Sequence, residues 1–255
     1  MRTPDELRAL VEDYLVALEF SADVGGLSDA MRYALAGGGK RIRPVLCLAT
    51  AEAVGCKAEQ ALPAAVALEL VHSFSLVHDD LPALDDDALR RGRPSTHVQW
   101  GEATAILAGD ALLAEATRLA LTYPSPAIAL ELVEATVGMI GGQYLDIDRS
   151  ADLIELHRLK TGRLFAASIG IALRVAELAE VDQKPWRDFA EELGLLFQLV
   201  DDILDRDGYV LVHGVEETRR LAEEAAGRAR TQLAEIEADT SVLDEIVAHL
   251  AARTS

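Results

Sequence analysis

Two clusters of aspartates, each placed directly after an apolar stretch, are the residues of this sequence best suited to do chemistry. The segment 79–87 reads Asp-Asp-Leu-Pro-Ala-Leu-Asp-Asp-Asp, and the segment 201–205 reads Asp-Asp-Ile-Leu-Asp. Carboxylates this close repel one another and raise each other's pKa, so a fold that gathers them needs cations nearby. Oxygen-only ligand sets suit Mg²⁺, which is held by a few carboxylates together with substrate phosphates. The pattern predicts a magnesium-dependent enzyme that acts on a diphosphate.

The alternative is that these acidic runs are simply solvated. The chain has 43 Asp and Glu residues, and blocks of like charge are commonly exposed or disordered. A single run would favour this interpretation. Two runs that each follow an apolar segment, residues 72–78 and 193–200, argue against it, because solvated tails do not directly follow core sequence.

Composition narrows the class of protein. Of the 255 residues, 50% are hydrophobic and only 5% are aromatic, which favours a large helical core over β-structure. The net charge of −19 argues against binding to nucleic acid or to an anionic membrane. An anionic substrate therefore has to be drawn in by a local basic pocket and by metal.

The two cysteines and the hydropathy pattern bear on location. Cys47 and Cys56 have no metal-ligand spacing and form no disulfide framework, so the sequence is interpreted as cytoplasmic. No uninterrupted apolar run approaches the roughly 18 residues of a membrane span, and no signal-like segment opens the chain. We expect a soluble protein without a membrane span.

Helical periodicity predicts one all-α domain over residues 1–255, with about ten or more helices and no strands. Pro4, Pro44 and Pro63 are expected to begin helices, because proline is favoured in the first helical turn. Ser28 or Asp29 is expected to cap a short helix that ends at the glycines 37–39. Apart from this short helix, the expected helices are 4–20, 44–53, 63–79, 102–122, 126–145, 151–158, 160–179, 185–205, 215–236 and 241–252.

Three basic segments accompany the aspartates. Residues 37–44 read Gly-Gly-Gly-Lys-Arg-Ile-Arg-Pro, residues 90–94 read Arg-Arg-Gly-Arg-Pro, and residues 160–163 read Lys-Thr-Gly-Arg. Taken alone, each fits a helix end or simple neutralisation of nearby acids. The segment 90–94, however, would place guanidinium groups where metal-bridged phosphate oxygens lie.

A di-iron site is the rival metal centre. Glu69 and His72 stand three apart, as in carboxylate-bridged di-iron bundles, but such sites need two Glu-x-x-His pairs. No other histidine here has a glutamate three residues before it. The sequence therefore favours an aspartate-held magnesium cluster.

The order of these motifs closely resembles the trans-isoprenyl diphosphate synthases. Gly-Gly-Lys-Arg-x-Arg-Pro, Asp-Asp-x-x-x-x-Asp with Arg-Arg-Gly-x-Pro, Lys-Thr-Gly, and Phe-Gln-x-x-Asp-Asp-x-x-Asp follow one another over residues 30–205. The segment 76–87 looks most like the bacterial farnesyl diphosphate synthases. The resemblance implies a helical bundle around a central cavity, the isoprenoid synthase type, acting as a homodimer with Mg²⁺.

The resemblance also implies roles for individual residues, the substrates being isopentenyl diphosphate and an allylic diphosphate. Metal would be held by Asp79, Asp80, Asp85, Asp201, Asp202 and Asp205. Isopentenyl diphosphate would be held by Lys40, Arg43, His72 and Arg91, and the allylic substrate by Arg90, Lys160, Thr161 and Gln198. Gln143 and Asp146 are expected to support these groups from behind.

Product length is expected to depend on the helix that ends at Asp79. Phe74 lies roughly 7.5 Å below it along the helix axis, and Ser75 shares its face but is small. An aromatic residue at this position stops elongation early in the resembling family. The hypothesis is a C15 product, farnesyl diphosphate, with geranylgeranyl diphosphate as the alternative; that Phe74 merely packs in the core is the simpler reading.

The chain departs from the family pattern after the second aspartate motif. Relatives carry a longer loop there with lysines that close over the diphosphate, whereas this chain has no lysine after Lys184. Arg206, Tyr209 and His213 are the side chains available to substitute. Because of this departure, a second hypothesis remains: the chain is a non-catalytic subunit that modulates another synthase. A class I terpene cyclase fits less well, because it lacks the Gly-Gly-Lys-Arg cluster and the second Asp-Asp-x-x-Asp.

Overall fold

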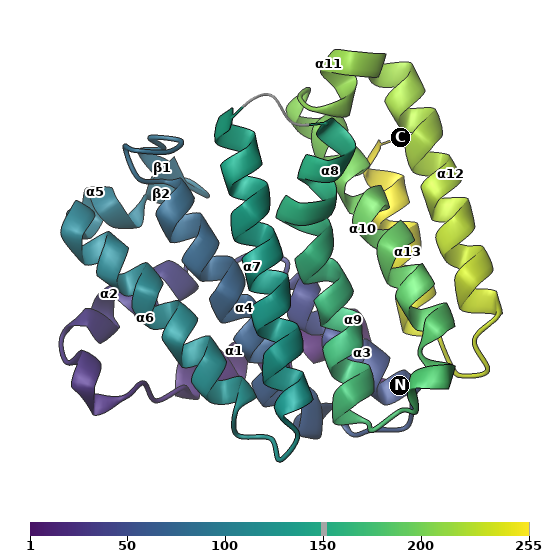
Figure 1. Ribbon diagram of the computed structural model, residues 1–255, viewed down its shortest axis with the longest axis horizontal. Coiled ribbons are helices and arrows are strands. Elements are labelled where there is room, and N and C mark those ends of the chain that lie inside the picture. Colours follow the sequence, from purple (N-terminus) through teal and green to yellow (C-terminus); the bar gives the residue numbers. More distant parts are fainter. Residues whose placement is uncertain (149–151, 255) are drawn as a thin grey trace.

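The computed structural model describes residues 1–148 and 152–254, and nearly all of its regular structure is helical (Figure 1). The all-α prediction is confirmed. Short 3₁₀ turns join several helices, and a π turn (Arg158–Gly162) joins α8 to α9. The helices are α1 (Pro4–Ala17), α2 (Leu27–Leu35), α3 (Ile42–Ala53), α4 (Ala58–Asp79), α5 (Thr96–Trp100), α6 (Glu102–Ala120), α7 (Pro126–Asp148), α8 (Leu153–His157), α9 (Arg163–Val175), α10 (Lys184–Asp205), α11 (Tyr209–His213), α12 (Val215–Ala234) and α13 (Ser241–Ala251).

Three short elements differ from the sequence prediction. A two-stranded antiparallel hairpin, β1 (Leu89–Arg90) and β2 (Arg93–Pro94), lies where no strand was predicted. Its turn residues Arg91 and Gly92 both have positive φ, 53° and 76°, as a type I′ turn requires. A strand of two residues is too short to show the alternation of apolar and polar residues by which strands are predicted. The five-residue helices α5 and α11 escaped prediction for the same reason.

Helix α4 begins at Ala58 rather than at Pro63, which lies inside the helix. Proline interrupts the ladder of helical hydrogen bonds. The Tyr123 hydroxyl repairs the interruption, because it accepts a hydrogen bond from Ala64 N (3.2 Å) and donates one to Gln60 O (2.7 Å). A residue 60 positions further along the chain thus extends the helix by more than a turn. Local sequence signals do not contain this contact.

Helix α4 is the central helix of the bundle, packed against α3, α6 and α9. By length and composition it is apolar enough to cross a membrane, yet 67% of its most apolar window is buried within the protein. Most of its residues between Ala61 and Val77 are buried on all faces, which is the behaviour of a core helix. Its last residue, Asp79, emerges from this core at the site.

The start of α3 is fixed to α4 by one buried ion pair. Arg41 has φ 47° and is 4% exposed, and its guanidinium group donates to Glu69 on α4 (2.6 Å). It also donates to Glu12 (2.7 Å) and to the carbonyl of Leu35 (2.6 Å). Leaving one partner of such a pair unpaired typically costs about 3–5 kcal/mol. The loop that carries Lys40 is therefore anchored at its end.

Candidate active site

The helix ends that carry the two aspartate clusters lie at the same end of the bundle. The C-terminal ends of α4 and α10 point toward the top of Figure 1, where the β1–β2 hairpin and α11 also lie. Segments from the first, second and last thirds of the sequence meet there. The order of motifs along the chain thus becomes a cluster in space.

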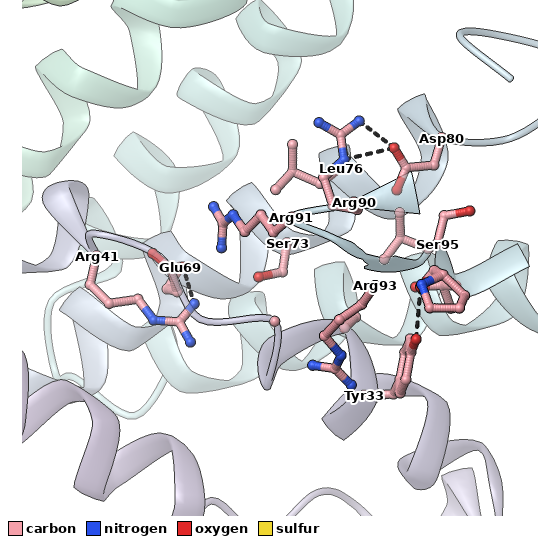
Figure 2. A pocket seen from close by; sticks show the side chains of 15 residues that line it. Tyr33, Arg41, Glu69, Ser73, Leu76, Asp80, Arg90, Arg91, Arg93 and Ser95 are labelled. Carbon is pink, nitrogen blue, oxygen red and sulfur yellow. Dashed lines mark hydrogen bonds and ion pairs between the residues drawn. The ribbon is translucent and has the colours of Figure 1, made fainter. Parts of the chain in front are cut away.

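Asp80 is held by the hairpin. It is 2% exposed, and Arg90 donates to its Oδ1 from Nε (2.8 Å) and from Nη2. Arg90 also reaches Asp87 (3.2 Å). Figure 2 shows Arg91 between this pair and the Arg41–Glu69 pair, in a pocket that all of them line. Arg90 therefore neutralises the second aspartate of the first cluster.

Asp79 and Asp85 are brought together by the chain reversal after α4. The N–H of Asp85 donates to the carbonyl of Asp79 (2.9 Å), which closes the insertion between the aspartates into a compact turn. Burial and the charge of Asp85 raise the pKa of Asp79 to about 6, although the positive charge of Lys160 opposes them. Burial also raises the pKa of Asp85. Among the residues that the structure describes, neither carboxylate has an ion-pair partner like the Arg90 of Asp80.

In the second cluster, too, one aspartate is hydrogen-bonded within the protein and its neighbour faces a cavity. Asp202 is 5% exposed and accepts hydrogen bonds from Gln198 Nε2 (2.6 Å) and from the N–H of Tyr209 (2.8 Å). Burial and the neighbouring charge of Asp205 raise the pKa of Asp201. Asp201 faces a cavity, whereas Asp202 turns toward the segment that follows α10.

A basic cavity of about 380 Å³ lies beside Asp201. Burial lowers the pKa of Arg43 to about 10, and it lowers the pKa of Lys40 and of His72 as well. The Nε atom of Arg43 is buried without a hydrogen-bond partner in the structure. The predicted isopentenyl diphosphate residues line this cavity together: Lys40, Arg43, His72 and Arg91. An anion would give these groups their missing partner.

Arg91 reaches this cavity because residue 39 is a glycine. The Arg91 guanidinium group donates to the carbonyl of Gly38 and lies where a side chain at Gly39 would stand. Gly39 also has φ 133°, a conformation that other residues rarely adopt. Of the three glycines before Lys40, Gly39 is thus required by the approach of a guanidinium group.

A second, largely apolar cavity of about 550 Å³ lies next to the basic one, and Arg43 and His72 line both. Asp79 lies at its rim, and Phe74, Ser75, Gln143, Lys160 and Thr161 are among its lining residues. Lys160 and Thr161 come from the π turn between α8 and α9, and such turns are frequent at functional sites. Lys160 pairs with Asp146 on α7 (2.5 Å).

The donor set fits magnesium bound in the company of a substrate. Within residues 1–148 and 152–254, no three carboxylate, imidazole or thiolate side chains stand close enough to form a metal site alone. Asp79, Asp85 and Asp201 are partly buried carboxylates with raised pKa values, so each gains from a cation. Mg²⁺ accepts a few carboxylates and completes its shell with water and phosphate oxygens.

Two outcomes were not foreseen from the sequence. Arg253, near the end of the chain, lines the basic cavity, and its charge acts on Lys40 and Asp201. It belongs to no motif, and only the packing of α13 reveals it. Conversely, Asp80, Arg90, Gln198 and Asp202 are predicted site residues whose side chains bond to protein partners beside the cavities.

A helical bundle whose two aspartate-bearing helix ends meet over adjacent basic and apolar cavities defines a class of enzyme, the trans-prenyltransferases. The chain belongs to the polyprenyl synthetase family, whose family model, described as "Polyprenyl synthetase", matches residues 25–214. The predicted family, fold type and enzyme class are confirmed.

Relatives with different product names share this similarity. The chain is 41% identical to a geranylgeranyl diphosphate synthase of Cyanophora paradoxa, over 78% of this chain and 72% of that protein. It is 40% identical to the farnesyl diphosphate synthase of Bacillus subtilis, over 71% of this chain and 67% of the relative. A geranyltransferase structure from Legionella pneumophila superposes with a TM-score of 0.87 at 33% identity, covering 98% of this chain and 96% of that one.

Replacing Asp79 with Asn is expected to raise the free energy of unfolding of the metal-free protein by roughly 2 kcal/mol at pH 8. In the folded protein the pKa of Asp79 is about 6, above the ordinary aspartate value of 3.8, so the parent gains stability as pH falls through 6. The advantage of the variant should therefore shrink toward pH 4. Urea unfolding in EDTA measures it, with Asp13→Asn, an exposed position on α1, as the control. A variant less stable than the parent at pH 8 contradicts the expectation.

Proposed function

We propose that this chain is a magnesium-dependent prenyltransferase that joins isopentenyl diphosphate to an allylic diphosphate, dimethylallyl or geranyl. The product is a short-chain trans-prenyl diphosphate. The observation that carries the proposal is that a basic cavity and an apolar cavity lie side by side and share Arg43 and His72 as lining residues. A diphosphate fits the first and a hydrocarbon tail the second. The net charge of −19 suits a soluble, cytoplasmic enzyme.

In this proposal the basic cavity holds isopentenyl diphosphate. Arg43 and Arg91 offer guanidinium forks to the phosphate oxygens, and Lys40 offers a point charge. Burial and the surrounding arginines keep the pKa of His72 well below its ordinary value, so its imidazole is neutral and bonds without adding charge. The Arg43 guanidinium lies over the Phe165 ring at 4.8 Å, which fixes its plane.

The allylic diphosphate lies between Asp79, Asp85 and Asp201, with Asp80, Asp202 and Asp205 supporting the two clusters. Bound Mg²⁺ would supply charge stabilisation for the departing diphosphate. Lys160 and Thr161 lie at the rim of the apolar cavity and would contact the same group. Arg90 and Gln198 act by holding Asp80 and Asp202 in place, as their hydrogen bonds indicate.

The reaction breaks the allylic carbon–oxygen bond, and the double bond of isopentenyl diphosphate attacks the resulting cation. The released diphosphate accepts the proton that is lost. The chain then has to orient two substrates and exclude water. The adjacent cavities serve both needs, because the reacting carbons meet where Arg43 and His72 line the boundary.

Phe74 is the proposed floor for the growing chain, and the proposed product is farnesyl diphosphate. Phe74 is 7% exposed, lines the apolar cavity and lies edge-to-face with His78 at 5.0 Å. His78 is itself held through its Nε2 by the carbonyl of Ile106 on α6 (3.0 Å). His78 lies one turn nearer to Asp79 and therefore holds the Phe74 ring from that side. Ser75 bonds back to the His72 carbonyl and leaves the space above open.

The enzyme is proposed to be a homodimer joined through α6 and α7. Helix α7 exposes apolar side chains at intervals of three and four residues, which is the pattern of a helix face that packs on a partner. Because the face is one continuous stripe, an identical face of a second copy can cover it. The stripe consists of Leu130, Val133, Val137, Ile140, Tyr144 and Ile147, and its last three residues also line the apolar cavity.

Turnover with isopentenyl diphosphate, geranyl diphosphate and Mg²⁺ tests the proposed activity. Asp201→Ala should lose activity by at least about a hundredfold while helix content stays constant, because its carboxylate stabilises only the bound metal and leaving group. Asp244→Ala removes an exposed ion-pair partner and serves as the control. Parental turnover in EDTA, or a purified parent that makes no product, would contradict the proposal, the latter favouring a non-catalytic subunit.

Phe74→Ala is expected to shift the product from C15 toward C20 and longer chains, since it opens space beneath the first turn of the cavity wall. Mass spectrometry of the dephosphorylated products measures the shift. The control is Phe189→Ala, which empties a fully buried core position on α10 outside the cavity and should leave product length unchanged. An unchanged product distribution in Phe74→Ala would show that Phe74 does not limit the length of the product.

Val137→Glu is expected to convert the dimer to a monomer, because it places a charge in the centre of the exposed stripe on α7. Light scattering at micromolar concentration measures the mass. Val181→Glu makes the same change at an 85% exposed position outside the stripe and should leave the dimer intact. A parental mass equal to that of one chain would contradict the assembly.

A further inference from the structure

The turn after α10 is built around the Asp202 carboxylate. Its Oδ2 accepts the N–H of Tyr209 (2.8 Å), and its Oδ1 accepts Gln198 Nε2 (2.6 Å). Gly208 has φ 50°, and a side chain there would collide with the same carboxylate. Asp202 therefore holds the start of α11 against the end of α10.

This turn positions Tyr209 against His157 of α8. It is 6% exposed, and its ring stacks on the His157 ring with centroids 5.3 Å apart and planes at 20°. His157 in turn lies 3.6 Å from Asp202. The three side chains form one contact between α8, α10 and α11.

His157 is the last residue of α8 and directly precedes the π turn that carries Lys160 and Thr161. On its other side this turn packs against α7, where a side chain at Gly142 would collide with the Lys160 backbone. The turn is thus held by α7, by α10, where Gly194 packs on Gly162, and by the His157–Tyr209 stack. The stack is the support at the N-terminal end of the turn, and its loss leaves the contacts with α7 and α10.

We propose that Tyr209 and His157 are positioning residues that hold the π turn so that Lys160 and Thr161 face the allylic diphosphate. The inference rests on the proposed function and adds a role for α11, whose segment 206–214 contains no lysine. The stack acts through the turn, and neither ring contacts the substrate.

A matched pair of variants tests this role. Tyr209→Ala removes the ring, whereas Tyr209→Phe keeps the stack and removes only the hydroxyl. Tyr209→Ala should raise KM for geranyl diphosphate about tenfold and lower kcat, because misplacing a binding group weakens both. KM for isopentenyl diphosphate should stay within about twofold, since its cavity lies on other elements. Tyr209→Phe should match the parent in all three constants.

A double-mutant cycle separates positioning from general loosening. His157→Ala should reproduce the effect of Tyr209→Ala, and the double variant should lose no more than either single variant, because both break the same stack. Additive losses, or equal increases in the two KM values, would overturn the proposal. Thermal melts of all variants identify any that fail to fold.

Amide hydrogen exchange supplies a readout that needs no turnover, so a failure of the proposed function remains distinguishable. Residues 158–162 should exchange faster in Tyr209→Ala than in the parent, and at the parental rate in Tyr209→Phe. If the parent makes no prenyl diphosphate, the proposed function fails while exchange still decides whether the stack holds the turn. Unchanged exchange in Tyr209→Ala would overturn the positioning role.

Discussion

The cost of removing carboxylates from water is the constraint on which this site depends. In each adjacent pair of aspartates the fold gives the second member hydrogen-bond donors: Asp80 receives Arg90, and Asp202 receives an amide side chain and a backbone N–H. Within the described residues, the first members, Asp79 and Asp201, receive no such donor; burial raises their pKa values, as it also raises the pKa of Asp202. One aspartate of each pair secures a helix end, and the other stays available for a cation.

The features that the sequence predicted are those written in local patterns. Helical periodicity and proline positions predicted most helices within a few residues, because an apolar stripe every three or four residues is a local property. The order of motifs predicted the family and the enzyme class. It also indicated that Lys40, His72 and Arg91, from three separate segments, belong to one cavity, and the structure brings them together.

What the sequence did not reveal depends on contacts between distant residues. Arg253 reaches the basic cavity only through the packing of α13, and Asp202 is used by the turn after α10. The sequence predicted a break between residues 158 and 160, whereas a π turn joins α8 to α9 there. The predicted helix 151–158 begins outside the described residues and continues in α8.

The hydroxyl that bridges Pro63 in α4 has a consequence for how the chain is made. Residues 58–64 leave the ribosome long before Tyr123, so the carbonyl of Gln60 and the N–H of Ala64 first bond to water. The first turns of the central helix are complete only when the α6–α7 connection has been synthesised and has folded back. The N-terminal part of the bundle is therefore expected to complete its assembly only after nearly half of the protein has been synthesised.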